Sequence, residues 1–539
     1  MIKNLLLKFD ENTISSEDFP LKLRKNGDFW RLHLDYMQSG KNNELGVYSH
    51  AQKNPVVKRE GNETSVFYNG LIAEDGTEHD VKLTLKITQI DGACYFSAQM
   101  QNDGTARINE LQYPLLEFDC DEQSDKESKL IIPEGLGRII DNPHDHAKNF
   151  HTEYMSADYK NVWEMFMYPG QMSMPWMGLQ KGNEYLYLGF HSEKWRQCSF
   201  SVGTEPRESD EKYMIYALSS YPAVYPGENV TYDGFVIAGF DGDWRDGCDF
   251  YRAWVDETWN FPTRKEGFRQ ITGWQRVILK HQYGEIFHTY KDLPVIYEQG
   301  KKAGLNMLLV FAWWVEGMDN GYPNYMPDPA LGGEEELKKA IKTINDDGGI
   351  VILYANGHII DVNTDYYEQV GSKISVKDVE LNEYRESYKF SNNGTLLRYG
   401  HKTFATGCYG TEEWRNKLLE IEKRHIALGS NGTFFDQIGC CYNFCFNNTH
   451  EHGNRIDLAP EFRLSAVKNM AKTLGKNQYF GTEWTVDRLA SVVDFVHGCG
   501  FGQWFSPDAY PYVFRYTFPD VIISNRLLHD ERKGWKSKA

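Results

Sequence analysis

The sequence predicts a multidomain protein in which an N-terminal β-sandwich precedes a (β/α)8 barrel of the TIM type, with the completeness of the barrel at its C-terminus left open. Up to about Phe240, short alternating apolar runs are divided by Gly, Asn and Asp clusters, which is typical of an all-β domain. After Gly267, strand-like and helix-like segments alternate, which is typical of a parallel α/β fold. The length of 539 residues also exceeds one ordinary domain of roughly 150 residues.

These patterns divide the chain into three parts. Residues 1–242 are predicted to form the β-sandwich, 243–265 a linker helix and 266–539 the barrel. The linker is indicated by a helical apolar period from Asp243 to Trp259, which Pro262 closes.

The barrel region contains seven candidate strands, of which the last two are weaker. They are Ile271–Leu279, Asn306–Trp313, Ile350–Tyr354, Thr433–Asp436, Tyr479–Glu483, Cys499–Phe505 and Val521–Ser524. Helical patterns between them cover Leu293–Ala303, Glu334–Asn345, Glu412–Ala427, Glu461–Leu474 and Val486–Val496. A barrel fits better than an open sheet, because no Gly-rich dinucleotide or phosphate motif follows any strand. The eighth strand is not visible.

The composition excludes several classes of partner. A formal net charge of −18 argues against nucleic acid or an anionic membrane surface. No run approaches the ~20 apolar residues of a membrane span. The N-terminus has only Leu5 to Leu7 as an uninterrupted apolar run and no small-residue cleavage site, so we interpret it as a first strand and the protein as cytoplasmic. Nine thinly spread cysteines fit reduced thiols better than a disulfide framework.

Two acids close neighbouring candidate strands. Asp436 ends the strand that follows the helix at 412–427, and Glu483 ends the next strand, after a further helical segment. Two strands joined by a helical crossover are expected to be parallel neighbours, so both acids should lie at the same strand end, where barrels carry their chemistry. The alternative is that one acid caps a helix and the other is solvated.

The other predicted strand ends carry aromatic, amide, imidazole and acidic side chains. We expect Trp313, Trp314 and Trp484 to form platforms for a ligand, and the remaining candidate ligand-binding residues are Glu316, Asp319, Tyr354, Asn356, His358, Gln437 and Arg515. Such a set, with few basic groups, suits a neutral, hydroxyl-rich ligand, and an aromatic content of 14% suits the apolar faces of sugar rings. Glycoside cleavage needs two carboxyl groups, which Asp436 and Glu483 can supply.

Four segments carry a resemblance to a known family. They read WWVEGMDNGYPNYMPDPALGG (313–333), GGIVILYANGHIID (348–361), GCYGTEEWRNKLLEIEKRHIALGSNGTFFDQIG (407–439) and YFGTEW (479–484). The region from Trp244 onward resembles a bacterial family of glycosidase-like barrels with an N-terminal β-sandwich, and more distantly is similar to endo-α-N-acetylgalactosaminidases and retaining α-galactosidases. The resemblance implies a glycoside hydrolase acting on α-linked sugars with retention, in which Asp436 is the nucleophile and Glu483 the acid/base. An oligosaccharide or glycoside is the implied substrate, and the sugar does not carry over.

Two alternatives remain open. A β-acting barrel scheme would need a general acid on strand four and a nucleophilic Glu on strand seven, but strand four offers Asp436 with no preceding Asn, and no Glu lies near residues 521–524. The other alternative is a carbohydrate-binding protein in which the same cleft binds sugar with little or no turnover.

One loop could hold zinc on residue types alone. It contains Cys440, Cys441, Cys445, His450 and His452. The spacing fits no standard closed site and the loop directly follows Asp436, so we interpret it as lining the substrate. We therefore expect no metal and no organic cofactor.

The end of the sequence leads to a further expectation. After Asp530-Glu531 only the polar, basic stretch RKGWKSKA follows, whereas members of the resembling family continue. A parallel barrel that lacks a strand exposes unpaired backbone groups on two edges. We therefore expect that no eighth strand follows residues 521–524 and that the sandwich or a partner subunit covers the gap, which leaves a homo-oligomer open, or that the closure is unusual and activity is low.

Overall fold

The structure is a computed structural model. It describes residues 19–36, 44–119, 126–143, 162–204, 213–259, 265–388, 402–439, 443–497 and 508–524, together with Phe261 and short pieces of the first 16 residues. The chain forms two compact units. The first comprises residues 1–260, 452–460 and 502–519, and the second residues 261–451, 461–501 and 520–539.

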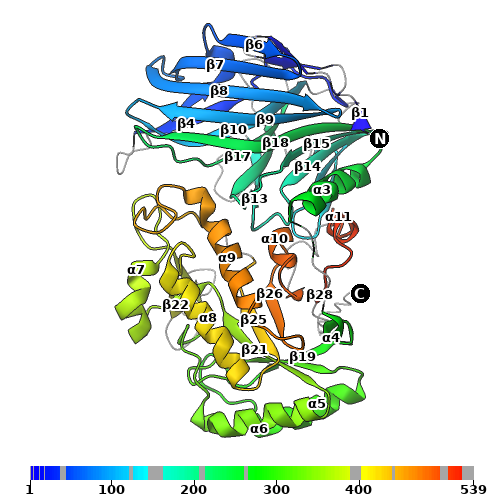
Figure 1. Ribbon diagram of the computed structural model, residues 1–539, viewed down its shortest axis with the longest axis vertical. Helices are drawn as coiled ribbons and strands as arrows, with labels where there is room; N and C mark the ends of the chain where they lie inside the picture. The colour runs from blue at the N-terminus through cyan, green and yellow to red at the C-terminus, as the bar shows by residue number, and fades with distance from the viewer. Residues whose placement is uncertain are drawn as a thin grey trace. The chain divides into compact units, whose positions relative to one another are not determined.

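The first unit is built on two large antiparallel sheets (Figure 1). One has the order β12 (Arg138–Asp141), β11 (Ser128–Ile132), β14 (Trp176–Lys181), β15 (Glu184–Phe190), β18 (Asn229–Asp241), β9 (Ala93–Asn102), β8 (Glu78–Ile90), β7 (Glu63–Ile72) and β6 (Val56–Glu60), with β1 (Ile2–Lys3) beside β18. The other has the order β13 (Val162–Tyr168), β16 (Cys198–Thr204), β17 (Tyr213–Ser220), β10 (Arg107–Asp119), β4 (Arg31–Asp35) and β5 (Glu44–Tyr48). A small hairpin joins β2 (Lys8–Asp10) to β3 (Thr13–Ser15).

Buried aromatic side chains join the two sheets of the first unit. Tyr113 of β10 contacts Phe96 of β9 and Phe235 of β18, with ring centroids 5.5 and 5.8 Å apart. These contacts bury the inward residues of both sheets, as alternating strands require. The predicted helix after the strands is confirmed as α3 (Trp244–Thr258), where Asp243 and Asp246 form a capping box, and α3 packs on α11 (Tyr512–Thr517).

The second unit contains a seven-stranded parallel sheet. Its order is β19 (Trp274–Ile278), β20 (Met307–Phe311), β21 (Ile350–Asn356), β25 (Gly432–Asp436), β26 (Tyr479–Glu483), β27 (Phe495–His497) and β28 (Ile523–Ser524). The first five predicted strands and the seventh are therefore confirmed, and the order follows the sequence because each crossover joins neighbouring strands.

The sixth strand lies earlier than predicted. The helix expected over Val486–Val496 ends after one turn as α10 (Asp487–Ala490), and β27 follows at Phe495. Asp494 pairs this segment with β26. Its backbone N–H donates to the Phe480 carbonyl and its carboxylate accepts from the Phe480 N–H, each at 2.8 Å. The expected strand at 499–505 lies outside the described residues.

The parallel sheet is curled. The Trp274 ring of β19 meets the His497 ring of β27 edge-on, with centroids 4.7 Å apart, although β19 pairs only with β20 in the described part of the chain. Because first and sixth strands can touch only if the sheet bends round, the inner face is concave. Within the described ranges no hydrogen-bonded pairing joins β19 to β28 and no eighth strand is present.

Helices cover the outer face of this sheet. They are α5 (Leu293–Lys302), α6 (Gly333–Asp346), α8 (Glu412–Ala427) and α9 (Ala459–Ala471), with α4 (Glu266–Arg269) at the amino end of the strands (Figure 1). Phe268 of α4 stacks on Phe495 and meets Tyr479, so it closes the floor of the sheet. Gly429, at φ +92°, ends α8. Among the described helices, none has the length and apolar character needed to cross a membrane.

A buried carboxyl on α8 makes stability depend on pH. Burial raises the pKa of Glu422 to about 7, so between about pH 4.5 and 7 the unfolded chain loses this proton while the folded chain keeps it. Stability from this group therefore falls as pH rises. We expect Glu422→Gln to match the wild type near pH 4.5 and to exceed it by about 3 kcal/mol at pH 8. Urea unfolding at both pH values measures the difference, and the exposed Glu413→Gln is the matched control. Equal gains at both pH values would contradict this assignment.

Candidate functional site

Asp436 and Glu483 lie abreast at the carboxyl edge of the parallel sheet. β25 and β26 pair through Phe435 and Thr482, and the two acids are the next residues on each strand. Because in-register residues of parallel strands point to the same face, both carboxyl groups project to one side. The neighbouring strands extend the row, since Asn356 of β21 pairs with Asp436 and His497 of β27 pairs with Glu483.

An aromatic layer lies one step below this row on the same face. Phe434 meets Phe311, Tyr354 and Phe495 with ring centroids 6.1 to 6.3 Å apart. Phe434 is two residues before Asp436, so the acid stands directly above an apolar floor. The partly exposed carboxyl groups therefore sit between a water-excluding base and the open strand end.

Two tyrosines link Asp436 to a second acid. The Tyr354 hydroxyl lies 2.7 Å from Asp436 Oδ2 and donates to it, and the Tyr322 hydroxyl lies 3.3 Å from that of Tyr354 and 3.2 Å from Asp319 Oδ1. Burial, followed by the charge of Asp436, holds the pKa of Tyr354 well above its ordinary value, so the phenol stays protonated. The hydrogen bond fixes the orientation of the Asp436 carboxylate.

Removing the Tyr354 hydroxyl tests this hydrogen bond. A hydrogen bond to a charged group contributes about 1.5–3 kcal/mol, so Tyr354→Phe should lower kcat/KM roughly 10- to 100-fold on any substrate that the wild type turns over. The aromatic ring, which stacks on Trp314, is kept, so the midpoint of urea unfolding should change little. Unchanged kinetics in a folded variant would show that Asp436 does not need this donor.

Trp313 and Trp314 are enclosed by protein. Both are 0% exposed, and their indole N–H groups donate to the backbone carbonyls of Tyr354 and Asn320 at 3.0 and 2.9 Å. Neither ring presents a face to a ligand, in contrast to the predicted platform role. Their large side chains fill the layer behind Tyr354 instead.

Asn356 and His358 are buried and act on protein groups. Asn356 accepts from the backbone of His358 and donates to Gln437 Oε1 at 2.7 Å. His358 Nε2 lies 3.6 Å from Glu386, and burial lowers the pKa of His358 to about 4, so the ring is neutral near pH 7. These contacts position Gln437 and Glu386, a different role from the predicted direct reading of hydroxyls.

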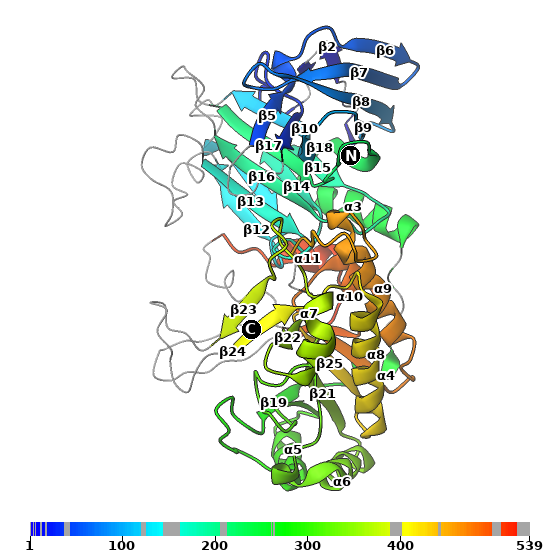
Figure 2. The ribbon, with the colours of Figure 1, turned by 90° about the vertical axis from the view of Figure 1, so that its left-hand side faces the viewer.

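Glu386 was not anticipated from the sequence. It lies on β23 (Arg385–Tyr388), in a three-stranded antiparallel sheet with β24 (Lys402–Thr406) and β22 (Ile359–Asp361), seen in Figure 2. Its carboxylate accepts from Gln437 Nε2 at 3.2 Å. A third acid therefore stands beside the strand end that carries Asp436.

The loop after β25 presses against the end of β26. Gln437 and Trp484 adopt left-handed backbone conformations with φ of +62° and +69°, which turn the chain sharply after each acid. A side chain on Gly439 would lie 2.3 Å from the Glu483 carbonyl oxygen. This close approach of two backbones sets the relative position of the loops that carry the acids. Trp484 remains partly exposed, as a ligand platform requires.

Gly439→Ala should disturb this arrangement. The added methyl has no space without a shift of the backbone, and displacements near 1 Å in an active site cost on the order of 100-fold in rate. We expect kcat/KM to fall by about that factor, with a stability loss of about 1–3 kcal/mol. Gly475→Ala is the control, since its methyl would meet only Gln478 at 3.5 Å. Equal kcat/KM values for Gly439→Ala and Gly475→Ala would contradict the prediction.

The remaining predicted residues lie apart from the row. Glu316 lines a hollow of about 570 Å³ together with Lys280, Asn320 and Asp361 at the ends of the first three strands. Arg515 is exposed on α11 and belongs to the first unit, so the parallel sheet does not carry it.

Part of the chain matches a family model and a named relative. Residues 229–487 match a family model described as "Domain of unknown function (DUF6259)". A Bacteroides thetaiotaomicron protein named "Putative glycoside hydrolase" is 27% identical over 281 residues, which cover 50% of this chain and 38% of that protein. The match thus spans well under half of the relative's length.

Comparison with solved structures finds the same fold. The α-N-acetylgalactosaminidase NagBb from Bifidobacterium bifidum, in complex with GalNAc, aligns with a TM-score of 0.70 at 14% identity, over 97% of this chain and 83% of that one. The GH36 α-galactosidase AgaA from Geobacillus stearothermophilus aligns with a TM-score of 0.52 at 10% identity, over 98% and 78%. At these identities the likeness concerns the fold alone.

Proposed function

We propose that this protein is a retaining glycoside hydrolase that acts on α-linked sugars, with Asp436 as nucleophile and Glu483 as acid/base. The observation that carries the proposal is the placement of these two acids side by side on adjacent parallel strands. A named glycoside hydrolase among the relatives and glycosidases among the fold neighbours support the reaction class. The curled sheet and its helices support a barrel of the (β/α)8 type.

The spacing of the strands favours retention. Neighbouring strands lie about 4.8 Å apart. Carboxyl groups that project in parallel from such strands suit the separation of about 5–5.5 Å found in retaining enzymes better than the separation of about 6.5–9.5 Å found in inverting enzymes, which hold a water between the two groups.

The chemistry has two steps. Asp436 attacks the anomeric carbon while Glu483 gives a proton to the leaving oxygen, so the glycosidic bond breaks and a glycosyl ester forms on Asp436. Glu483, now a carboxylate, takes a proton from water, whose oxygen displaces Asp436. Tyr354 holds the Asp436 carboxylate through the bond to Oδ2, and Gln437 and Glu386 offer polar contacts for sugar hydroxyls.

A panel of aryl α- and β-glycosides, including α-galactoside and α-N-acetylgalactosaminide, tests the proposal. We expect turnover of at least one α-glycoside, and NMR of the first product should show the α-anomer. If the first product were the β-anomer, the mechanism would be inverting and not retaining. Tight sugar binding with no turnover across the panel would favour the binding-protein alternative.

A further inference from the structure

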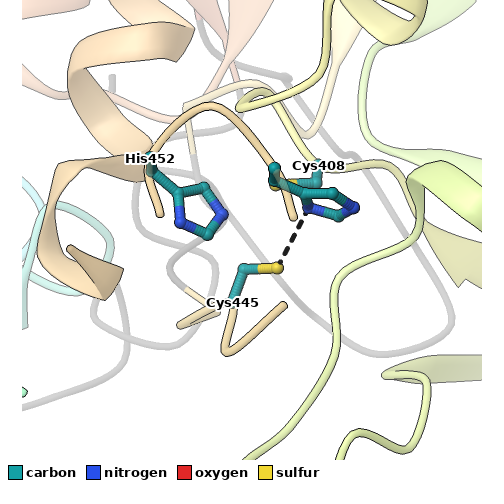
Figure 3. A group of neighbouring side chains, drawn as sticks. Cys408, Cys445 and His452 are labelled. Atoms are coloured by element: carbon teal, nitrogen blue, oxygen red, sulfur yellow. Dashed lines mark hydrogen bonds between the residues drawn. The ribbon is translucent and has the colours of Figure 1, made fainter. Parts of the chain in front are cut away.

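Four buried side chains with metal-binding atoms converge beside the loop after β25. They are Cys408, Cys445, His450 and His452, and one ligand atom from each lies within 4.8 Å of the others. Figure 3 shows Cys408, Cys445 and His452 directed at the same space. Cys408 comes from the turn before α8, outside the loop, so the spacing of the loop residues alone did not reveal the set.

The distances are close to those of a tetrahedral site. With Zn–S of about 2.3 Å and Zn–N of about 2.0–2.1 Å, ligand atoms in a tetrahedron are separated by about 3.3–3.8 Å. Cys445 Sγ lies 3.4 Å from His450 Nδ1, and the Cys408 thiol forms a hydrogen bond with that of Cys445. A contraction of about 1 Å at the widest pair would complete the geometry.

In each imidazole ring, the nitrogen that points away from the cluster lies beside a backbone carbonyl. His450 Nε2 lies 3.2 Å from the carbonyl of Lys373, and His452 Nδ1 lies 2.8 Å from that of Gly453. A carbonyl can only accept, so these ring nitrogens carry the protons, which leaves His450 Nδ1 and His452 Nε2 as ligand atoms. Metal-binding histidines are oriented in this way. The Asn447 amide nitrogen also lies 3.0 Å from His450 Nε2, while the Asn447 oxygen accepts from the N–H and the hydroxyl of Thr449, so the Lys373 carbonyl is the acceptor for the Nε2 proton.

The charge of the set matches its surroundings. Cys408 and Cys445 pack with Val376 and Tyr384 in an apolar cluster, where an unbalanced charge would be costly. Two thiolates and two neutral imidazoles around a divalent cation sum to zero. The ligand types, two sulfur and two nitrogen, select zinc over calcium, magnesium or manganese.

We propose that Cys408, Cys445, His450 and His452 form a closed structural Zn²⁺ site. With all four positions taken by protein, the metal has no place for substrate or catalytic water. The site joins the turn before α8 to the loop that leaves Asp436. Two further bonds support the same junction, since the Thr411 hydroxyl donates to the Cys408 carbonyl at 2.7 Å and the Glu451 N–H donates to Gly410 at 2.8 Å.

Metal analysis of the 539-residue chain tests the proposal. The protein is purified without a metal-affinity resin and its zinc is measured by mass spectrometry. We expect about one zinc per chain in the wild type and in Cys94→Ser, a buried-thiol control in the first unit, and a loss of at least about ten-fold in Cys408→Ser and Cys445→Ser.

A second measurement needs no variant and stays valid if the serine variants fail to fold. Wild-type protein is depleted with a chelator under reducing conditions and titrated with Co²⁺. We expect the visible bands of tetrahedral Co²⁺, thiolate-to-cobalt charge transfer in the near ultraviolet, and a rise in the thermal unfolding midpoint. Wild-type protein with neither zinc nor these Co²⁺ bands would overturn the proposal and leave four packed core side chains. Zinc retained in both serine variants would overturn it as well.

Discussion

Asp436→Asn should lower kcat on the best α-glycoside by on the order of 10⁴-fold or more. The amide cannot form the glycosyl ester, and the Tyr354 hydroxyl would keep the side chain in place, so the variant should stay folded. Steady-state kinetics and urea unfolding, measured together, separate loss of chemistry from loss of structure. Asp347→Asn, an exposed acid after α6 that pairs with Lys301, is the control and should leave kcat unchanged.

Asp436→Ala adds a stereochemical test of the same residue. Azide can enter the space of the lost carboxylate and attack the anomeric carbon, while the leaving oxygen takes its proton from Glu483. An α-glycoside should then give a β-glycosyl azide, and the rate should rise with azide concentration. If azide neither accelerates the reaction nor appears in the product, another residue is the nucleophile.

Glu483→Gln should show a strong dependence on the leaving group. General acid catalysis contributes about 10²–10⁴-fold, so turnover of a substrate with a sugar leaving group should fall by roughly that factor. Aryl glycosides of acidic phenols need no proton in the first step, so they should form the glycosyl-enzyme at close to the wild-type rate. Pre-steady-state release of the phenol, compared across phenols of different pKa, measures this directly.

The pH profile provides the control for Glu483. The wild type should lose activity at high pH as the acid deprotonates, and Glu483→Gln should not show this limb. Equal losses for acidic phenols and for sugar leaving groups would place the proton donor elsewhere, and Glu386, beside Gln437, would become the next candidate.

Much of the parallel sheet could be predicted from the sequence because its strands are short apolar runs separated by helical segments, of which α5 and α6 are the most clearly amphipathic. The alternation also indicated that Asp436 and Glu483 lie at the same strand end, which requires only that a helical crossover joins parallel neighbours. No tertiary information is needed for either inference. The register itself, with the two acids abreast, came from the structure.

Other features depend on contacts that the local sequence does not encode. The burial of Trp313 and Trp314 results from Tyr325 and Tyr354 packing around them, so an aromatic pair at a strand end could be either platform or core. The helical reading of 486–496 failed because Asp494 bonds to β26, which also concealed His497. Glu386 and Cys408 reach their partners from segments distant in the sequence. Among the site residues that the sequence did not predict, Tyr322 lies in a recognisable local pattern, the aromatic run Gly-Tyr-Pro-Asn-Tyr.

The contact between Trp274 and His497 also bears on the order in which the molecule is built. A ribosome releases β19 long before β27, so Trp274 must wait for its partner while strands β20, β21 and β25 can already pair with near neighbours. Contacts between residues so far apart in the chain form slowly. During synthesis, therefore, there is a stage at which the strand that carries Asp436 has been made, but the two strands that carry Glu483 and His497 have not. On the proposed assignment, the pair of acids is therefore complete only after β26 and β27 have been synthesised.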